Sequence, residues 1–301
     1  MRYTVSEDRI RIEPNEQMRK KSIQQFLDDY FISSSKQNDL IAKQMILLDG
    51  EPVPSAEEII GGKVLDILFE KSEPDWVPAD EPCTVVYEDP FVYAVHKEAG
   101  VIIHGDEDDT ECLNAMAARY QLDHGIHAPV RPLHRLDRDT CGLVLYCKIP
   151  FFQPWFDRQM KEKNITRYYL AVSMGRCEKG KKFTVRKKLA RDRHRSGAYR
   201  VSPNGKDAAT HFECLDSRGG YVLFGCTLET GRTHQIRVHL ADAGYPIVND
   251  VLYGRPSKQF DGMGLWAQSI TFRSPVSNKK HRIRDFENPM YTYFESGGNK
   301  R

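Results

Sequence analysis

Residues 131–148 read RPLHRLDRDTCGLVLYCK, a dense run of charged side chains followed directly by an apolar, strand-like stretch. The charged and polar members of the run are His134, Arg135, Asp137, Arg138, Asp139 and Thr140. One explanation is a salt-bridged loop between two strands. The other is a reactive centre, because a carboxylate beside arginines stays ionised and can then serve as a nucleophile or a base. Both explanations place this run beside a core strand.

Strand-like and helix-like patterns alternate on both sides of this segment. The apolar stretches typical of strands cover residues 83–89, 90–97, 142–148, 167–175, 207–217 and 221–229. Helix-like stretches cover residues 111–122 and 234–244. Such a mixture predicts an α+β domain built on a mixed or largely antiparallel sheet.

The chain before residue 83 has a different organisation. We expect a polar lead-in over residues 1–18, a small unit over 19–72, a Pro- and acid-rich linker over 73–82 and the main domain over 83–295. Within the small unit, apolar side chains recur at helical spacing: Ile23, Phe26, Leu27 and Tyr30. Asp49-Gly50 then predicts a tight turn between apolar runs.

Composition excludes several classes of protein. The 301 residues are 40% hydrophobic and 29% charged, which is typical of a globular chain, and no apolar run approaches the ~20 residues that a membrane span needs. The first residues have no apolar signal-peptide core. The seven cysteines are scattered without a C-x-x-C pair, which argues against a zinc site and suits reduced thiols. We therefore expect a cytoplasmic protein that holds no metal and contacts no membrane.

Positive charge is concentrated in one stretch. Residues 176–195 contain ten basic residues and two acidic ones, a net charge of +8, whereas the whole chain carries only +2 and the remainder therefore −6. This pattern is typical of a protein that binds a polyanion such as RNA. The alternative is a solvated loop whose charges only keep the protein soluble. The candidate RNA contacts here are Lys181, Lys182, Arg186, Lys187 and Lys188.

Two further segments carry motifs. Residues 229–254 read ETGRTHQIRVHLADAGYPIVNDVLYG, and residues 165–172 read ITRYYLAV. With residues 131–148 they resemble the RluA family of RNA pseudouridine synthases, whose motifs include H-R-L-D-x-x-T-S-G-L-L-L, K-x-Y-L-A-L-V and T-G-R-T-H-Q-I-R-V-H. Weaker similarities extend the resemblance over about two thirds of the chain, residues 83–275.

The resemblance implies catalytic roles for three residues. Asp137 stands at the essential aspartate of H-R-L-D, and Arg237 at the arginine that pairs with it. Tyr169 stands at the tyrosine that stacks on the target base, with Arg167 in the place of the usual lysine. A guanidinium can orient a carboxylate and keep it ionised. An aromatic face replaces the stacking that a flipped-out base loses, worth ~1–3 kcal/mol per base.

Three positions depart from the family pattern. Cys141 replaces the usual serine, Asn249 replaces a glycine, and residues 96–100 read HKEAG where the family has N-K-P-A-G. The small unit resembles the α-L RNA-binding module named after small-subunit ribosomal protein four, with two short helices, an L-D-G-E-P-V hairpin and the strand GGKVLDI. Its predicted recognition helix is poor in basic residues.

The implied reaction converts uridine in structured RNA to pseudouridine, with no cofactor and no metal. Asp137 would attack C1′, add to C6 or remove a proton from C2′, and the sequence leaves these three routes open. Candidate RNA contacts beside the motifs are Arg135, Arg138, Arg232 and His234. We expect a monomer that acts on large-subunit ribosomal RNA, with transfer RNA as the alternative substrate.

Two other functions compete with this interpretation. A catalytically silent RNA-binding or ribosome-assembly protein could use the same fold, although it would be expected to lose at least one of the three implied catalytic residues. A glycosidase acting on nucleosides would instead release free uracil, and the basic stretch argues against it.

Overall fold

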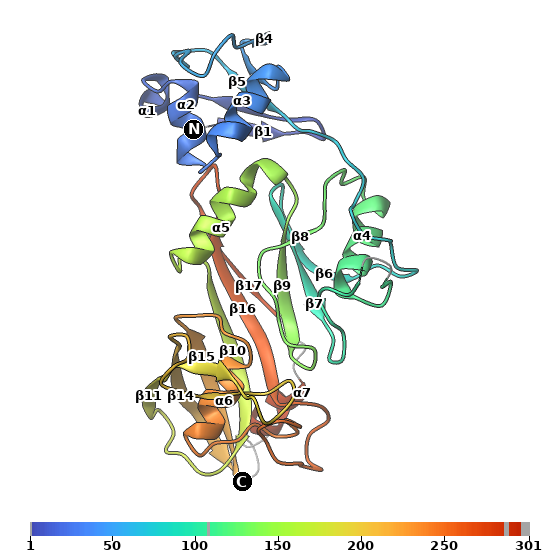
Figure 1. Ribbon diagram of the computed structural model, residues 1–301, viewed down its shortest axis with the longest axis vertical. Helices are drawn as coiled ribbons and strands as arrows, with labels where there is room; N and C mark the ends of the chain where they lie inside the picture. Colours follow the sequence, from blue (N-terminus) through green and yellow to red (C-terminus); the bar gives the residue numbers. More distant parts are fainter. Residues whose placement is uncertain (1, 107–108, 286–288, 296–301) are drawn as a thin grey trace.

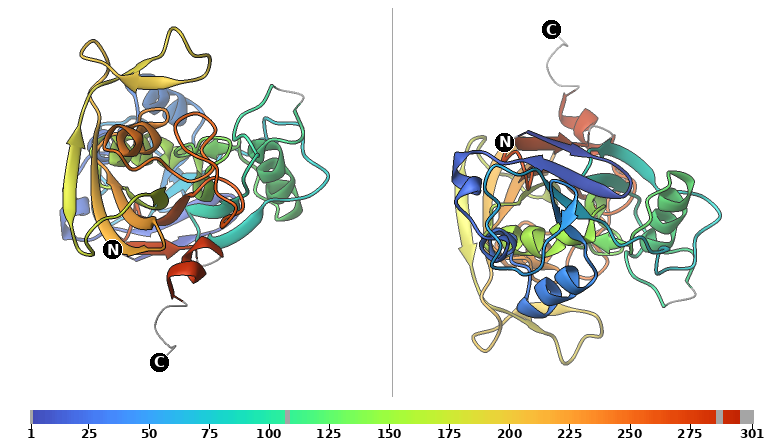
Figure 2. Two further views of the ribbon diagram at one scale, coloured as in Figure 1. Left: turned by 90° about the horizontal axis from the view of Figure 1, so that it is seen from below. Right: turned by 90° about the horizontal axis from the view of Figure 1, so that it is seen from above.

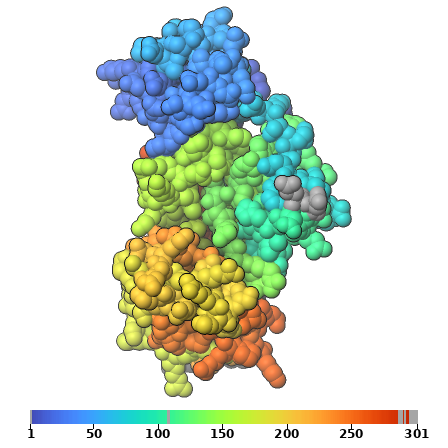
Figure 3. All heavy atoms as spheres, viewed as in Figure 1, coloured from blue at the N-terminus to red at the C-terminus, as the bar shows by residue number. Residues whose placement is uncertain are grey.

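The computed structural model describes residues 2–106, 109–285 and 289–295 of the chain (Figure 1). In this part of the chain, a small N-terminal unit sits on one end of a larger domain built on a long sheet. Figure 3 shows the small unit as a blue lobe that rests on the green residues of the larger domain. No helix in the described ranges is long and apolar enough to cross a membrane.

The N-terminal unit combines short helices with an antiparallel sheet, as expected for a small RNA-binding domain. Its sheet has the order β1-β2-β5-β3-β4. The elements are β1 (Arg2–Val5), β2 (Arg9–Glu13), α1 (Glu16–Arg19), α2 (Ile23–Asp29), α3 (Ser34–Ala42), β3 (Ile46–Leu48), β4 (Glu51–Pro52) and β5 (Leu65–Leu68). A capping box formed by Ser22 and Gln25 begins α2, and Asp49-Gly50 makes the predicted turn between β3 and β4.

The prediction of a polar lead-in over the first 18 residues was wrong, because β1 and β2 belong to the sheet of this unit. In β2 the residues alternate strictly, so that Ile10 and Ile12 are fully buried while the charged residues on either side of them are more exposed. Arg11 reaches across to Asp66 of β5, with 2.8 Å between Nε and Oδ1. The charged residues of its outer face make this segment look polar in the sequence, although it is a strand that pairs with β5.

The larger domain is built on a ten-stranded sheet, which confirms the predicted α+β class. Its main path runs β11-β14-β15-β10-β16-β9-β7-β6, with β17 beside β16 and β8 beside β9, and all pairs are antiparallel except β9 with β16. The strands are β6 (Thr84–Glu88), β7 (Val92–Lys97), β8 (Arg131–Pro132), β9 (Cys141–Cys147), β10 (Thr166–Met174), β11 (Lys182–Arg186), β14 (Ala209–Arg218), β15 (Tyr221–Leu228), β16 (Leu265–Arg273) and β17 (Lys280–Arg284).

Helices and one hairpin surround this sheet. They are α4 (Leu113–Asp123), the 3-10 turn η1 (Pro150–Phe152), α5 (Gln153–Lys161), α6 (Gln235–Asp242), α7 (Pro289–Glu295) and the hairpin of β12 (Leu189–Arg191) with β13 (Tyr199–Val201). The hairpin protrudes from the body as the yellow segment at the edge of both views in Figure 2.

The two parts of the molecule share one core. A continuous cluster of buried apolar side chains extends from the N-terminal unit to β9, η1 and α5. Tyr30 contacts the rings of Phe151 and Phe152 and donates a hydrogen bond from its hydroxyl to the carbonyl of Pro275 at 3.2 Å. The segment predicted to be a linker is also packed, since Asp75 binds the backbone amide of Val130 at 2.8 Å. The N-terminal unit is therefore held against the larger domain.

Gly142 makes possible the close approach of β9 and β16, the only parallel strand pair of the described sheet. Gly142 lies at the start of β9 with φ +108°, and a Cβ added there would sit 2.4 Å from the carbonyl oxygen of Ala267 on β16. Neither the backbone angle nor the space admits another residue. The strand that follows the charged run thus approaches β16 closely enough only because this residue has no side chain.

We predict that Gly142→Ala lowers the free energy of unfolding by about 2–4 kcal/mol, because a methyl group would force the two strands apart. Urea denaturation followed by circular dichroism measures the change. Gly62→Ala is the matched control, since a Cβ there meets open space. Equal stability of the two variants would contradict the proposed close approach.

Candidate active site

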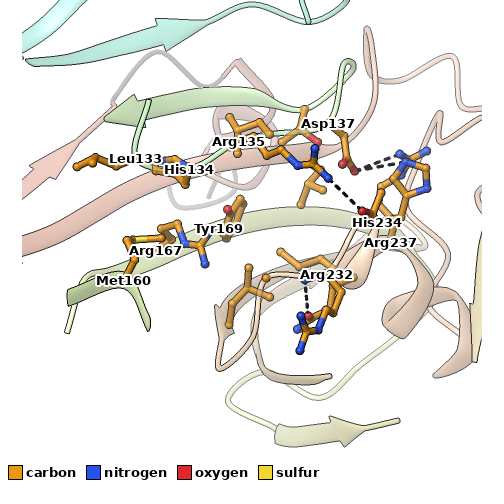
Figure 4. Close-up of a pocket in the computed structure, with 18 of the residues that line it drawn as sticks. Leu133, His134, Arg135, Asp137, Met160, Arg167, Tyr169, Arg232, His234 and Arg237 are labelled. Atoms are coloured by element: carbon orange, nitrogen blue, oxygen red, sulfur yellow. Dashed lines mark hydrogen bonds and ion pairs between the residues drawn. The ribbon is translucent and has the colours of Figure 1, made fainter. Parts of the chain in front are cut away.

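Most of the charged run of residues 134–140 lines a pocket of about 380 Å³. Asp137 stands on the loop between β8 and β9, and its side chain is 23% exposed. The pocket collects residues from this loop, from α5, from β10 and from the turn that begins α6 (Figure 4). Segments more than 90 residues apart in the sequence therefore meet around one carboxylate.

Arg237 of α6 connects two carboxylates. Its Nε and Nη2 donate to Oδ2 and Oδ1 of Asp250 at 2.7 and 2.8 Å, and its Nη1 donates to Oδ2 of Asp137 at 3.2 Å. Asp250 is fully buried and also accepts hydrogen bonds from the backbone amides of Leu252 and Tyr253. Arg237 therefore binds Asp250 in a bidentate manner, and its remaining nitrogen fixes the orientation of the Asp137 carboxylate.

Hydrogen bonds decide the charge of this network. Burial opposes ionisation of Asp250, but the hydrogen bonds from Arg237 and two backbone amides outweigh it and hold the pKa of Asp250 below its ordinary value. Burial also opposes the charge on Arg237, and the bonds from Asp250 and Asp137 raise the pKa of its guanidinium nevertheless. The pair is thus a buried ion pair with its hydrogen bonds satisfied.

His234 approaches the same carboxylate from the start of α6. Its Nε2 lies 3.9 Å from Oδ2 of Asp137, and its Nδ1 lies 2.8 Å from the hydroxyl of Tyr253. Burial lowers the pKa of His234, although Asp137 opposes this, so we expect a neutral ring at pH 7. The Tyr253 hydroxyl accepts from the amide of Tyr199 at 2.6 Å, so its own proton goes to Nδ1 of His234. The proton of the ring is then on Nε2, facing Asp137.

Tyr169 forms one wall of the pocket. It lies on β10 where the register with β16 shifts, and its side chain is largely buried between the sheet and α6. Burial raises the pKa of Tyr169, so the phenol stays protonated at neutral pH. The ring lies between Asp137 and Arg167 in Figure 4 and lines the pocket.

A buried lysine supports the loop that carries Asp137. Lys97 is fully buried, and its Nζ donates to the carbonyls of Glu98, Val101 and Arg138 at 2.7–2.8 Å. The amide of Gly100 donates to the same Arg138 carbonyl at 3.0 Å. Burial lowers the pKa of Lys97 to about 8. The HKEAG turn thus keeps its lysine and uses it to hold the backbone next to Asp137.

Comparison with known proteins identifies the family. Residues 92–242 match the family model described as RNA pseudouridylate synthase. The chain belongs to the RNA pseudouridylate synthase family. The match covers the loop of Asp137, the strand of Tyr169 and the helix of Arg237, and it confirms the resemblance and the enzyme class predicted from the motifs.

Relatives of the chain support the same assignment. An uncharacterized RNA pseudouridine synthase, YhcT, of Bacillus subtilis is 35% identical over 266 residues, which covers 85% of this chain and 87% of the relative. The ribosomal large subunit pseudouridine synthase D of Escherichia coli strain K12 is 31% identical over 277 residues, 85% of this chain and 83% of the relative.

Among solved structures, human RNA pseudouridylate synthase domain containing 4 is similar in fold. Its TM-score is 0.57 at 17% sequence identity, over 70% of this chain and 90% of that one. Human RNA pseudouridylate synthase domain containing 1 gives a TM-score of 0.56 at 22% identity, over 68% of this chain and 83% of that one. At these levels of sequence identity, the two similarities show a shared fold.

The structure of this RNA pseudouridylate synthase places the predicted site residues in two groups. Asp137, Tyr169, Arg237, Arg135, Arg232 and His234 line the pocket. Arg138 is exposed beside it and contacts Asp139 at 3.2 Å. The five basic residues of the second group, Lys181, Lys182, Arg186, Lys187 and Lys188, lie on or beside β11 and do not line the pocket.

Much of the positive charge in the basic stretch is neutralised within the chain. Four of the five residues of that second group form ion pairs: Lys182 with Glu213, Arg186 with Glu229, Lys187 with Asp242 and Lys188 with Asp207. The sequence count of +8 therefore overstates the free charge that this face offers to RNA. In the N-terminal unit, Lys36 and Lys43 are likewise shared between Asp39 and Glu70.

Several residues of the pocket were missed from the sequence. Met160 and Lys161 at the end of α5 line the pocket and carry no motif, and Asp250 and Tyr253, which hold Arg237 and His234 from behind the pocket lining, lie in the second motif without a role that the sequence reveals. His239, by contrast, is buried and joins Thr210 to the carbonyl of Lys187, which makes it structural. In the described ranges, no group of three or more His, Cys, Asp or Glu side chains is placed to hold a metal.

The family departure at Asn249 has a local explanation. Asn249 adopts φ +57°, a left-handed conformation that asparagine tolerates better than most residues. Its Nδ2 donates to the carbonyls of Phe260 and Gly262, and its Oδ1 accepts from the amide of Ser257. Asparagine thus takes the backbone angle of the usual glycine and closes the loop that follows Asp250.

We predict that Asp250→Asn lowers the free energy of unfolding by about 3–5 kcal/mol at pH 7, because it leaves the Arg237 guanidinium buried and half paired. The pKa of Asp250 is lower in the folded protein than in the unfolded chain, so its contribution is complete above about pH 4 and is lost as the pH falls towards the folded-state value. The difference between wild type and variant should therefore shrink below pH 4.

Urea unfolding at pH 7 and pH 3 measures both quantities. Asp242→Asn is the control, since its carboxylate makes a half-exposed pair with Lys187 that should contribute only about 0–1 kcal/mol. A stability loss for Asp250→Asn no larger than that of the control would contradict this account of the buried pair.

Proposed function

We propose that this chain converts specific uridines of large-subunit ribosomal RNA to pseudouridine, with Asp137 as the catalytic carboxylate. The observation that carries the proposal is that Asp137, held by Arg237, lines the same pocket as Tyr169. The ribosomal substrate is supported by relatives that are named ribosomal large subunit pseudouridine synthase D. Transfer RNA is the alternative substrate.

The pocket suits one extruded nucleoside. A volume of about 380 Å³ lies in the range of small-ligand sites, and chemistry on a base requires the nucleotide to leave its helix. Tyr169 would stack on the uracil in place of the neighbouring bases. Arg135, Lys161 and Arg232 at the rim would bind the flanking phosphates, which contributes affinity without reading sequence.

Asp137 is oriented through only one of its oxygens. The contacts from Arg237 and His234 both fall on Oδ2, and within the described residues no hydrogen bond reaches Oδ1. We propose that Oδ1 meets the substrate at C1′, at C6 or at the proton on C2′. The isomerisation then breaks the N1–C1′ bond and forms the C5–C1′ bond, while C5 loses its proton to solvent and N1 takes up a proton from solvent. No oxidant or reductant enters this balance.

The remaining parts of the chain would bind RNA around this pocket. We propose that the exposed residues of the basic stretch, with Lys181 unpaired in the described structure, contact RNA outside the pocket, and that the N-terminal unit extends the RNA-binding surface. We retain the division into a unit at 19–72 and a domain at 83–295, with β1 and β2 added to the first.

We predict that deleting the gene and replacing Asp137→Ala both abolish pseudouridine at the same positions of cellular RNA. Carbodiimide-blocked reverse transcription across total RNA maps these positions and thereby names the substrate. Asp139→Asn is the matched control, since that carboxylate contacts only the exposed Arg138 in the described structure and should leave the map unchanged.

Each outcome of this mapping discriminates between functions. Loss of the same sites in both strains supports the proposal, and their place in ribosomal or transfer RNA decides the substrate. An unchanged map after deletion would favour a catalytically silent RNA-binding protein. Release of free uracil from RNA by the purified protein would instead indicate a glycosidase.

A further inference from the structure

The pocket has a second polar end, on the far side of Tyr169 from Asp137. In Figure 4 the side chain of Tyr169 lies between Asp137 on one side and Arg167 with His134 on the other. Arg167 is half-buried, and its Nη2 lies so close to Gly231 that an added Cβ would be only 3.1 Å away. In the described part of the chain this guanidinium forms a side-chain hydrogen bond with Tyr169 and no ion pair with a carboxylate.

The side chains around Arg167 offer donors. His134 accepts a hydrogen bond at Nε2 from the amide of Leu145 at 3.3 Å, so the proton of its neutral ring is on Nδ1. This Nδ1 is buried and has no hydrogen-bond partner within the described residues. Burial lowers the pKa of His134 to about 3, which keeps the ring neutral. Asp137 is therefore the only acidic side chain of the pocket, at the opposite end.

We propose that Arg167 recognises the uracil carbonyl oxygen opposite the glycosidic bond and thereby selects uridine. This proposal rests on the proposed function. With C1′ of the target beside Asp137 and the ring stacked on Tyr169, N1 lies at the Asp137 end. The ring atom directly across from N1 is C4, so its oxygen O4 points to the end where Arg167 lies. A guanidinium there makes a charge-assisted hydrogen bond to that oxygen.

The symmetry of uracil makes this contact useful in substrate and product alike. The isomerisation turns the ring by half a turn about its N3–C6 axis, which exchanges N1 with C5 and C2 with C4. When C5 is joined to C1′, the atom directly across is C2, which also bears a carbonyl oxygen. Arg167 therefore faces an acceptor before and after the rotation.

The same contact rejects cytidine. Cytosine carries an amino group at C4, which presents N–H donors to a guanidinium that has only donors. A buried donor without an acceptor loses its hydrogen bond, and sites of this kind discriminate strongly between analogues. The half-buried Arg167 differs in this respect from the exposed Lys161, which suits a phosphate.

A pyrimidin-2-one ribonucleoside, which lacks O4, tests the contact directly. Short RNA hairpins would carry uridine, pyrimidin-2-one or cytidine at a position mapped in cells. Release of tritium from [5-³H]uridine gives kcat and KM for the uridine hairpin, and the other two hairpins are measured as competitive inhibitors. The proteins are wild type, Arg167→Gln, Arg167→Lys and the control Lys161→Gln.

For wild type we expect the pyrimidin-2-one hairpin to bind about 10- to 100-fold more weakly than the uridine hairpin, as for the loss of one charge-assisted hydrogen bond. With Arg167→Gln this ratio should fall to near one and kcat/KM on uridine should drop by a similar factor. Arg167→Lys, which keeps a charged donor, should retain part of the ratio. Lys161→Gln should weaken all hairpins equally and leave the ratio unchanged.

Two results would overturn the proposal. Equal weakening of all three hairpins by Arg167→Gln, with a smaller dependence on salt, would make Arg167 a phosphate contact. If Arg167→Gln leaves both the turnover of uridine and the preference for the uridine hairpin over the pyrimidin-2-one hairpin unchanged, Arg167 has no role in base selection. Absence of turnover by wild type on every hairpin is a separate result, which would refute the proposed function and withdraw this proposal with it.

Discussion

The Arg237 guanidinium, held between a buried carboxylate and a half-exposed one, is the interaction on which the rest of the site depends. Two of its nitrogens are committed to Asp250, and the direction of the third is thereby fixed towards Asp137. Breaking a buried pair of this kind costs several kcal/mol, whereas a single exposed ion pair contributes little. The orientation of Asp137 therefore depends, through Arg237, on Asp250, which lies 113 residues further along the chain.

Other parts of the fold serve the same carboxylate. Lys97 and Gly100 hold the carbonyl of Arg138, and the absence of a side chain at Gly142 lets β9 approach β16 immediately after the loop. Tyr253 packs its ring 5.2 Å from the Arg237 guanidinium and directs its hydroxyl proton to His234. These contacts are hydrogen bonds and steric constraints on backbone and rigid groups, which suits a site that must be formed before its substrate arrives.

The sequence predicted the α+β class and the family because the motifs are local. The residues implied by these motifs, Asp137, Tyr169 and Arg237, are brought to one pocket by the structure. The sequence failed where the outcome depends on contacts between distant segments. Charged residues on the outer face concealed strand β2, the partners of the basic stretch were spread from Asp207 to Asp242, and the role of Asp250 depends on a guanidinium from another element.

Replacing Arg237→Lys tests the central claim most directly, because lysine keeps the positive charge but lacks the fork that binds two carboxylates at once. The measurement is single-turnover tritium release from [5-³H]uridine-labelled large-subunit ribosomal RNA transcript by the purified proteins. If the fork orients Asp137, the rate constant should fall by about 100-fold or more while RNA affinity stays near that of wild type. A variant that turns over within a few-fold of wild type would contradict the account, since charge alone would then suffice.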